Sequence, residues 1–157
     1  MEEVAPTIEG GNRDVEVTAE GSIAWQYPVV LDTASLSGPA FASRLPSGDT
    51  LITDSNNNRV LEVDAETPPR VVWTYMTTNR PGAGNPLPTR AVRLANGHTL
   101  VTEMLDDQVI EIDATPEQNV VYTFGKLGVV RDGTNGLNEA YDAKVVGDFT
   151  GLTPPSM

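Results

Sequence analysis

The chain has 157 residues, a formal net charge of −12 and no cysteine. Its length fits a single domain with a sizeable core, and its 39% hydrophobic residues, with 14 Gly and 12 Pro, favour a turn-rich all-β protein. The acidity argues against a nucleic acid or an anionic membrane as partner, because phosphates would be repelled. The lack of cysteine excludes disulfides and thiolate metal sites.

The N-terminus carries no recognisable targeting signal. The first ten residues, MEEVAPTIEG, lack the basic and apolar regions of a signal peptide, and no apolar run is long enough to span a membrane. We therefore expect a cytoplasmic protein, or a periplasmic or secreted one if the sequence is a mature form from which a signal peptide has been removed.

In chain order, the first predicted elements are two short strands at 12–17 and 23–27. A fuller unit follows, with predicted strands at 41–45, 50–53, 59–64 and 71–75. Turn residues separate these runs: the PSGD run at 46–49 closes the first hairpin, and the Asn-rich run 54–58 is a loop. In 59–64, Val60 and Glu62 alternate with Leu61 and Val63, which is typical of a half-buried strand.

The next unit repeats the first at an ungapped offset of 49 residues. Thirteen of the 32 pairs that align 44–75 with 93–124 are identical. The second unit therefore has predicted strands at 91–94, 99–102, 109–113 and 120–124. Trp25, Trp73 and Tyr122 occupy one repeating position, so 12–27 corresponds to the second half of a unit. The stretch 140–152 stands where the first half of a fourth copy belongs, and its similarity to that half is faint.

Four short antiparallel strands per unit, at a period in the high forties, are typical of a β-propeller blade. We predict one propeller domain, 1–157, with a half blade at 12–27, whole blades at 41–76 and 89–125, and a degenerate half blade at 140–152. The recurring aromatic residues are expected to pack within and between blades.

Two runs of the first unit resemble known propeller families. The run 54–60 (DSNNNRV), followed by EVD at 62–64, is similar to the core of NHL repeats. The run 48–51 (GDTL), with VVWTY at 71–75, looks like blades of the PQQ-type and arylsulfotransferase propellers. The resemblance implies a propeller that hosts binding modules, lyases, hydrolases or transferases. Enzymes of this kind use histidines or metal ligands in loops, and the single histidine here, His98, aligns with Asp49, which disfavours histidine-based chemistry.

About three blades are too few to close a ring, since propellers have about 4–8. A two-fold homodimer would complete a six-bladed ring, and we predict this assembly. A chain cut from a longer propeller is the alternative.

Functional residues in a propeller usually lie on the face that carries the loops between second and third strands and the blade-to-blade connections. Those connections are 28–40, 76–89 and 125–139 here. Arginine clusters bind carboxylates or phosphates, although pairing with nearby Glu or Asp is the simpler explanation. The candidate ligand-binding residues at the channel mouth and in the loops are Arg44, Arg90, Arg93, Arg80, Asn85, Arg131 and Asp132.

The loops also contain hard oxygen ligands of the kind that Ca²⁺ or Mg²⁺ prefers. The candidates are Asp54, Asn56, Glu103, Asp106 and Asp107, with turn formation as the simpler role for these residues. No cofactor is predicted otherwise.

The sequence contains no Gly-x-Ser-x-Gly motif, no Ser/His/Asp series and no histidine pair. We therefore expect a non-catalytic module that binds or scaffolds a small ligand or a peptide on its loop face and channel. The alternative is a lyase, hydrolase or transferase that uses the channel arginines with loop carboxylates, with or without a metal.

Overall fold

The computed structural model describes residues 12–28, 35–129 and 136–148. Its regular elements are antiparallel strands and two short 3-10 turns, η1 (Ser55–Asn57) and η2 (Thr77–Asn79). In the part of the chain that is described, no helix has the length and apolar character needed to cross a membrane. The all-β prediction is confirmed.

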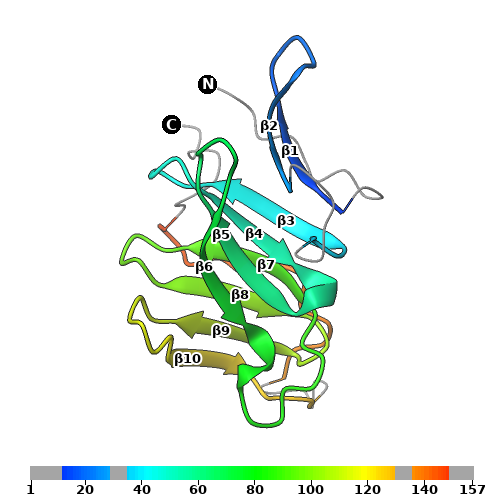
Figure 1. Ribbon diagram of the computed structural model, residues 1–157. Helices are drawn as coiled ribbons and strands as arrows, with labels where there is room; N and C mark the ends of the chain where they lie inside the picture. Colours follow the sequence, from blue (N-terminus) through cyan, green and yellow to red (C-terminus); the bar gives the residue numbers. More distant parts are fainter. Residues whose placement is uncertain (1–11, 29–34, 130–135, 149–157) are drawn as a thin grey trace.

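The strands form three sheets, which we name the half-blade, blade 1 and blade 2 (Figure 1). The half-blade pairs β1 (Asp14–Val17) with β2 (Ile23–Tyr27). Blade 1 has the order β3 (Pro39–Arg44), β4 (Thr50–Asp54), β5 (Arg59–Val63), β6 (Val71–Met76). Blade 2 has the order β7 (Pro88–Arg93), β8 (Thr99–Glu103), β9 (Gln108–Ile112), β10 (Val120–Gly125).

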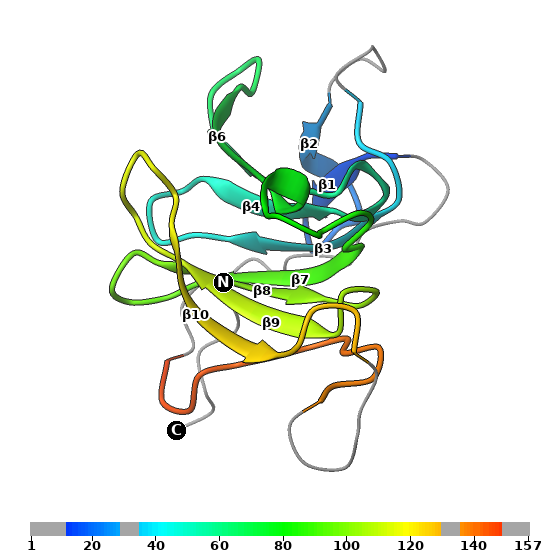
Figure 2. The same cartoon turned by 90° about the horizontal axis from the view of Figure 1, so that it is seen from below.

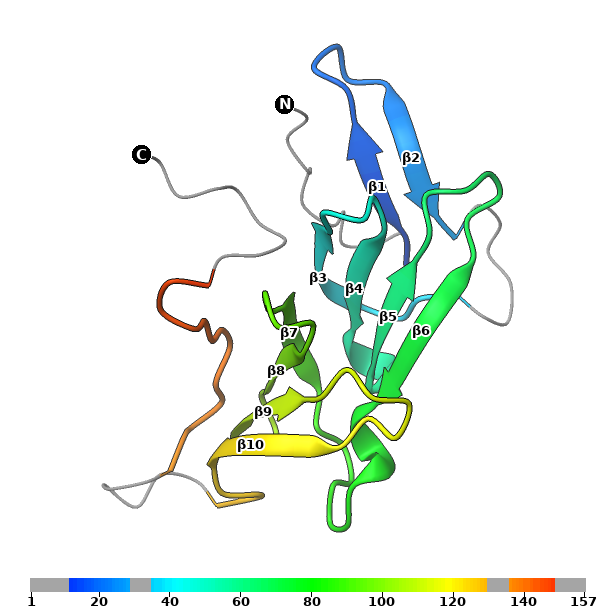
Figure 3. The ribbon, with the colours of Figure 1, turned by 90° about the vertical axis from the view of Figure 1, so that its left-hand side faces the viewer.

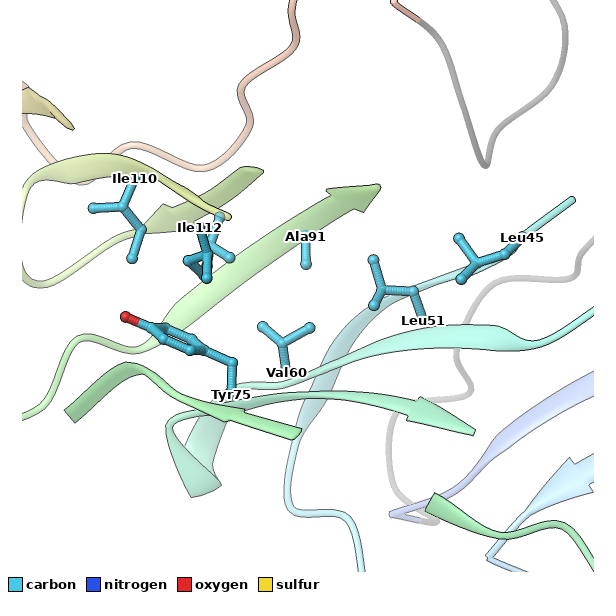
Figure 4. Packing of buried hydrophobic residues seen from close by; sticks show 8 residues of the cluster. Leu45, Leu51, Val60, Tyr75, Ala91, Ile110 and Ile112 are labelled. Carbon is cyan, nitrogen blue, oxygen red and sulfur yellow. The ribbon is translucent and has the colours of Figure 1, made fainter. Parts of the chain in front are cut away.

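The three sheets lie face to face in a fan, a propeller-like arrangement that Figures 2 and 3 show from two sides. The main core fills the space between blades 1 and 2, where Leu51, Val60 and Tyr75 meet Ile110 and Ile112 (Figure 4). A second cluster joins blade 1 to the half-blade through Ile52, Leu61, Val63, Tyr27 and Leu36. The predicted four-stranded antiparallel blades are therefore confirmed.

The half-buried character predicted for the third strand of blade 1 is wrong. Val60, Leu61 and Val63 are each no more than 1% exposed, although they lie on opposite faces of β5. Val60 faces blade 2 and the other two face the half-blade. Stacking covers both faces of a middle sheet, so an alternating sequence does not imply a solvated face here. The polar residue of the pattern, Glu62, lies against the next blade and is part of the candidate site.

The hairpin turns after β3 and β7 have the same geometry. In each, the first turn residue accepts a hydrogen bond from a glycine three positions later: Gly48 N–H to Leu45 O at 2.9 Å and Gly97 N–H to Leu94 O at 2.9 Å. Both glycines have φ in the left-handed region, at 97° and 85°. The predicted turn at 46–49 depends on this freedom, since other residues adopt such φ values at a cost.

A segment without regular strands, 136–148, runs across the face of blade 2 that points away from blade 1 (Figure 2). Leu137 and Ala143 pack there against Leu94, Leu100 and Val109. The segment contains one isolated bridge, Val145 to Asp148, in which Asp148 N–H donates to Val145 O at 3.1 Å. This turn differs from the two blade turns, because its left-handed glycine, Gly147 at φ 86°, lies one residue before the N–H donor, whereas Gly48 and Gly97 are themselves the donors. The degenerate half blade at 140–152 stays a prediction, and 149–152 lie outside the described residues.

Candidate functional site

The arginine that ends β3, Arg44, connects blade 1 to the half-blade. Its guanidinium forms a bidentate ion pair with Glu16 of β1, with Nε–Oε1 2.7 Å and Nη2–Oε2 2.5 Å. The same group lies over the ring of Trp25 of β2, 5.0 Å from its centroid. Its Nη1 donates to the carbonyl of Gly48 in the adjoining turn. All three contacts are structural, so this candidate ligand residue serves as a link between sheets.

Arg93, which ends β7, makes the same contacts one blade further on. Its Nη2 pairs with Glu62 Oε2 at 2.6 Å, its guanidinium lies 4.9 Å from the Trp73 ring centroid, and its Nη1 donates to Gly97 O at 3.2 Å. Burial raises the pKa of Glu62, and the Arg93 charge opposes that rise. The repeating unit is therefore an arginine that enters a glutamate–tryptophan socket on the preceding sheet.

We expect Arg93→Ala to lower the free energy of unfolding by about 1–3 kcal/mol. The side chains of the ion pair are 17–18% exposed, so the pair itself contributes modestly, and the cation–π contact and the bond to the turn carbonyl add to it. Urea denaturation at fixed protein concentration measures the change. Arg70→Ala, an exposed arginine on the 64–70 turn, is the control and should change stability by less than about 0.5 kcal/mol. Equal effects of the two substitutions would contradict the socket.

Arg90 links the innermost strands to the 136–148 segment. Its Nε lies 3.0 Å from Asp142 Oδ1, its Nη1 donates to Asp142 Oδ2 at 3.1 Å, and its guanidinium lies 4.2 Å from the ring centroid of Phe41. The structure thus pairs each of the three candidate arginines on β3 and β7 with a carboxylate. Their role in ligand binding stays a prediction.

A second group of charges gathers where the blade-to-blade connection 76–88 crosses the end of β8. Arg80 of this connection donates to Glu103, the last residue of β8, and to Gln108 Oε1 at 2.9 Å. Its Nη2 also lies 3.5 Å from Asp106 Oδ2. Three residues that the sequence nominated separately, one for an anionic ligand and two for a metal, therefore form one cluster, which we call the Arg80 cluster.

The Arg80 cluster is buried but its polar atoms are incompletely paired. Glu103 is 0% exposed. Burial raises its pKa to about 7, while the charge of Arg80 acts in the opposite direction and that of Asp106 adds to the rise. Among the described residues, Glu103 Oε1, Arg80 Nε and Asp106 Oδ2 have no hydrogen-bond partner. Buried polar atoms are nearly always satisfied in folded proteins, so three such atoms in one place call for an explanation.

The matching position in blade 1 is fully satisfied. Asp54 aligns with Glu103 and accepts hydrogen bonds from Ser37 N–H at 2.7 Å, Asn57 Nδ2 at 2.8 Å and Arg59 Nε at 2.6 Å. Its guanidinium partner lies five residues ahead in the same blade. In blade 2 this arginine is replaced by Gln108, and Arg80 supplies the charge from outside the repeat. The Arg80 cluster therefore departs from the repeating pattern.

The remaining candidates fix loops. Asn85 Oδ1 accepts from Asn58 Nδ2 at 2.8 Å, and Asn56 donates its backbone N–H to Ser37 O at 3.0 Å. Asp107 accepts from the backbone N–H of Glu139 at 2.8 Å. Across 12–28, 35–129 and 136–148, no group of three or more His, Cys, Asp or Glu is arranged to hold a metal ion. Arg131 and Asp132 lie outside the described residues.

The acidic partners of the recurring arginines were not predicted from the sequence. Glu16 and Glu62 recur at matching repeat positions, and that recurrence could have identified them as partners of the recurring arginines. The third member of this series, Glu111, accepts at Oε1 a hydrogen bond from His98 Nδ1 at 2.6 Å, so the single histidine is paired in a turn.

No protein-family model and no curated protein matches the sequence. Among solved structures, the chain is similar to a catalytically inactive virginiamycin B lyase from Staphylococcus aureus with quinupristin, at 20% identity and a TM-score of 0.52 over 72% of this chain and 34% of that one. It is also similar to a streptogramin B lyase, at 18% identity and a TM-score of 0.53 over 73% of this chain and 34% of that one. The chain thus spans about a third of their length, and the likeness shows a shared propeller-like fold.

Proposed function

We propose that this chain is a non-catalytic binding or scaffolding module that holds a small polar ligand or a peptide segment at the Arg80 cluster. The observation that carries the proposal is one cluster on the loop face with three buried polar atoms that have no hydrogen-bond partner among the described residues: Glu103 Oε1, Arg80 Nε and Asp106 Oδ2, the last of which has only a 3.5 Å ion pair with Arg80. The aligned position in blade 1 has its carboxylate saturated by the chain itself. Among the described residues, polar atoms at this position lack hydrogen bonds in blade 2 and not in blade 1. The cluster in blade 2 is therefore where a ligand could supply the missing hydrogen bonds.

The composition of the cluster indicates the ligand's chemistry. Two carboxylates surround one guanidinium, so an anion gains little. The unsatisfied atoms include one N–H donor and two carboxylate acceptors, which a hydroxyl or an amide can meet because each both donates and accepts. The side chains of Arg80 and Asp106 are 16% and 9% exposed, so a ligand that reached the three buried atoms would have to displace part of these side chains. A peptide backbone or a sugar hydroxyl fits these conditions.

Nitrogen-15 NMR tests the proposal. We expect the Arg80 Nε–H resonance to shift when the protein is titrated with acetylated dipeptide amides or monosaccharides. Asp106→Asn should weaken this response by about tenfold, equivalent to about 1.4 kcal/mol, and blade 1 already accommodates asparagine at the aligned Asn57. Glu66→Gln, which neutralises an exposed carboxylate on the 64–70 turn, is the matched control. An unchanged Arg80 resonance at millimolar concentrations of every probe would contradict the proposal.

A lyase-type enzyme is the second candidate. The buried Glu103, with its pKa raised to about 7 beside Arg80, has the property of a general acid or base near neutral pH. Solved structures of similar fold include a virginiamycin B lyase with quinupristin and a streptogramin B lyase. Incubation with quinupristin, followed by liquid chromatography, would show conversion that Glu103→Gln abolishes. Absence of conversion would remove this substrate from consideration.

A metal-assisted form of this enzyme can be tested separately. Ca²⁺ or Mg²⁺ at Glu103 and Asp106 would have to displace the Arg80 ion pairs. A rise of melting temperature with Ca²⁺ or Mg²⁺ that EDTA reverses and Asp106→Asn removes would favour the metal-assisted version.

A further inference from the structure

Among the described residues, only the inner half of the face of blade 2 that points away from blade 1 is covered. Leu94, Leu100 and Val109 are buried beneath the 136–148 segment. On the outermost strand, Tyr122 is 53% and Phe124 is 50% exposed. Phe124 lies directly across from Val109 in the sheet, so the buried and exposed residues share this face. We call the exposed part, Tyr122 and Phe124, the open patch.

Blade 1 shows what covers this position in a complete unit. Its equivalent of Phe124 is Tyr75, which is 3% exposed. Tyr75 packs in one cluster with Ile110 and Ile112 of β9, the third strand of the following blade (Figure 4). Val120 of β10, the fourth strand, packs against that cluster. The first strand of that blade supplies Ala91 to the inner part of the same cluster. On the face of blade 2 that points away from blade 1, Ala143 therefore takes the place of a first strand of a following blade. Among the described residues, nothing takes the place of its third and fourth strands.

The chain itself contains such a pair in the half-blade. Strand β1 pairs with β2 with the register of β5 and β6, including the bulge before the last pair. In both whole blades the third strand also pairs with a second strand, whereas the described residues give β1 no partner but β2. Ile23 faces Val17 across the sheet as Val120 faces Ile112. It is 51% exposed, although Val120 is packed against the core.

We propose that the open patch is covered by the half-blade of a second copy of this chain, with Ile23 of that copy packed on Tyr122 and Phe124. The first strand of the composite blade would come from 136–148, whose Ala143 packs on the inner part of the same face of blade 2. The exchange is reciprocal, so two junctions close a six-bladed ring. Blade 2 lacks the cover of a third and fourth strand, and the half-blade is a third and fourth strand without a first and second. This match identifies the half-blade of a second copy as the occupant.

Cysteine crosslinking tests the junction, since the chain has no cysteine of its own. The double variant Ile23→Cys/Phe124→Cys should form, on mild oxidation, a reducible covalent dimer of twice the 16.8 kDa chain mass. Val72→Cys/Phe124→Cys is the control, because Val72 is 55% exposed on β6 of blade 1 and lies away from the open patch. The control pair should give little covalent dimer.

Light scattering after size-exclusion chromatography gives a second measurement that needs no crosslink. The unaltered chain should run as a dimer, Phe124→Glu should shift it towards monomer, and Val72→Glu should leave it unchanged. A monomer at all concentrations would overturn the proposal and point to further blades of a longer polypeptide as the cover. Equal crosslinking in both cysteine pairs, or covalent ladders beyond the dimer, would overturn the closed ring as well. None of these outcomes depends on a ligand at the Arg80 cluster.

Discussion

Arg80→Ala is expected to destabilise the protein by about 3–5 kcal/mol at pH 8, the cost of breaking a buried ion pair by removing one partner. The substitution leaves Glu103, which is 0% exposed, beside Asp106 without a compensating charge. It also removes the donor to Gln108. Without the guanidinium the pKa of Glu103 rises further above its ordinary value, so the variant should lose stability as pH rises and regain much of it near pH 5. Urea denaturation at the two pH values measures the difference.

Two further variants separate charge from packing in that experiment. Arg80→Ala/Glu103→Gln should recover part of the loss at pH 8, because the uncompensated carboxylate is gone. Arg70→Ala should have little effect at either pH, as an exposed arginine on the 64–70 turn. A loss for Arg80→Ala that is small and independent of pH would mean that Glu103 is solvated in the variant, and the buried cluster would then be incorrect.

The 49-residue repeat allowed the all-β, four-stranded blade fold to be predicted from the sequence. Turn residues with left-handed φ, such as Gly48 and Gly97, and β-branched runs between them fixed the strand boundaries to within a few residues. The sequence could also have paired the arginines with their partners, because Arg44 and Arg93 occupy one repeat position and Glu16 and Glu62 occupy another. That step also requires knowing which neighbouring sheet each arginine contacts, which the period alone does not provide.

The Arg80 cluster could be predicted as residues but not as a site. Glu103 and Asp106 were proposed as metal ligands on the strength of their oxygens, and Arg80 as an anion ligand on the strength of its charge. The three meet because a connection outside the repeat crosses the end of β8. The path of such a loop leaves no periodic pattern in the sequence. The three residues could therefore be nominated from the sequence, but their contacts with one another could be seen only in the tertiary structure.

Asp14 is a further residue whose role appears in the structure alone. It lies across from Tyr27 on β2, as Val60 lies across from Tyr75 and Val109 from Phe124. A carboxylate thus stands where both whole blades have valine, and it is 2% exposed with Oδ1 unpartnered among the described residues. Burial raises the pKa of Asp14 to about 7, against the opposing effects of a backbone hydrogen bond and Arg44.

We expect Asp14→Val to stabilise the protein at pH 8 by on the order of 4 kcal/mol, with little effect at pH 4. The pKa of this carboxyl is about 7 in the folded protein against an ordinary value of 3.8. The folded state therefore holds the proton more tightly, and the wild-type chain loses stability as pH rises from about 4 to 7, at about 1.4 kcal/mol for each pH unit. Urea denaturation of both proteins at pH 4, 6 and 8 measures their difference, which cancels the parallel contribution of Glu103.

Asp14→Asn separates the two causes of that stabilisation. This substitution should remove the same pH dependence while it keeps a polar group in a buried place. Its gain in stability at pH 8 should therefore be smaller than that of Asp14→Val. Valine already occupies the equivalent position in both whole blades, as Val60 and Val109. Glu66→Gln, on the exposed turn, should leave the pH profile unchanged. Parallel profiles for wild type and Asp14→Val would show that Asp14 titrates as a solvated carboxyl, and the face between the half-blade and blade 1 would then have to be open to water.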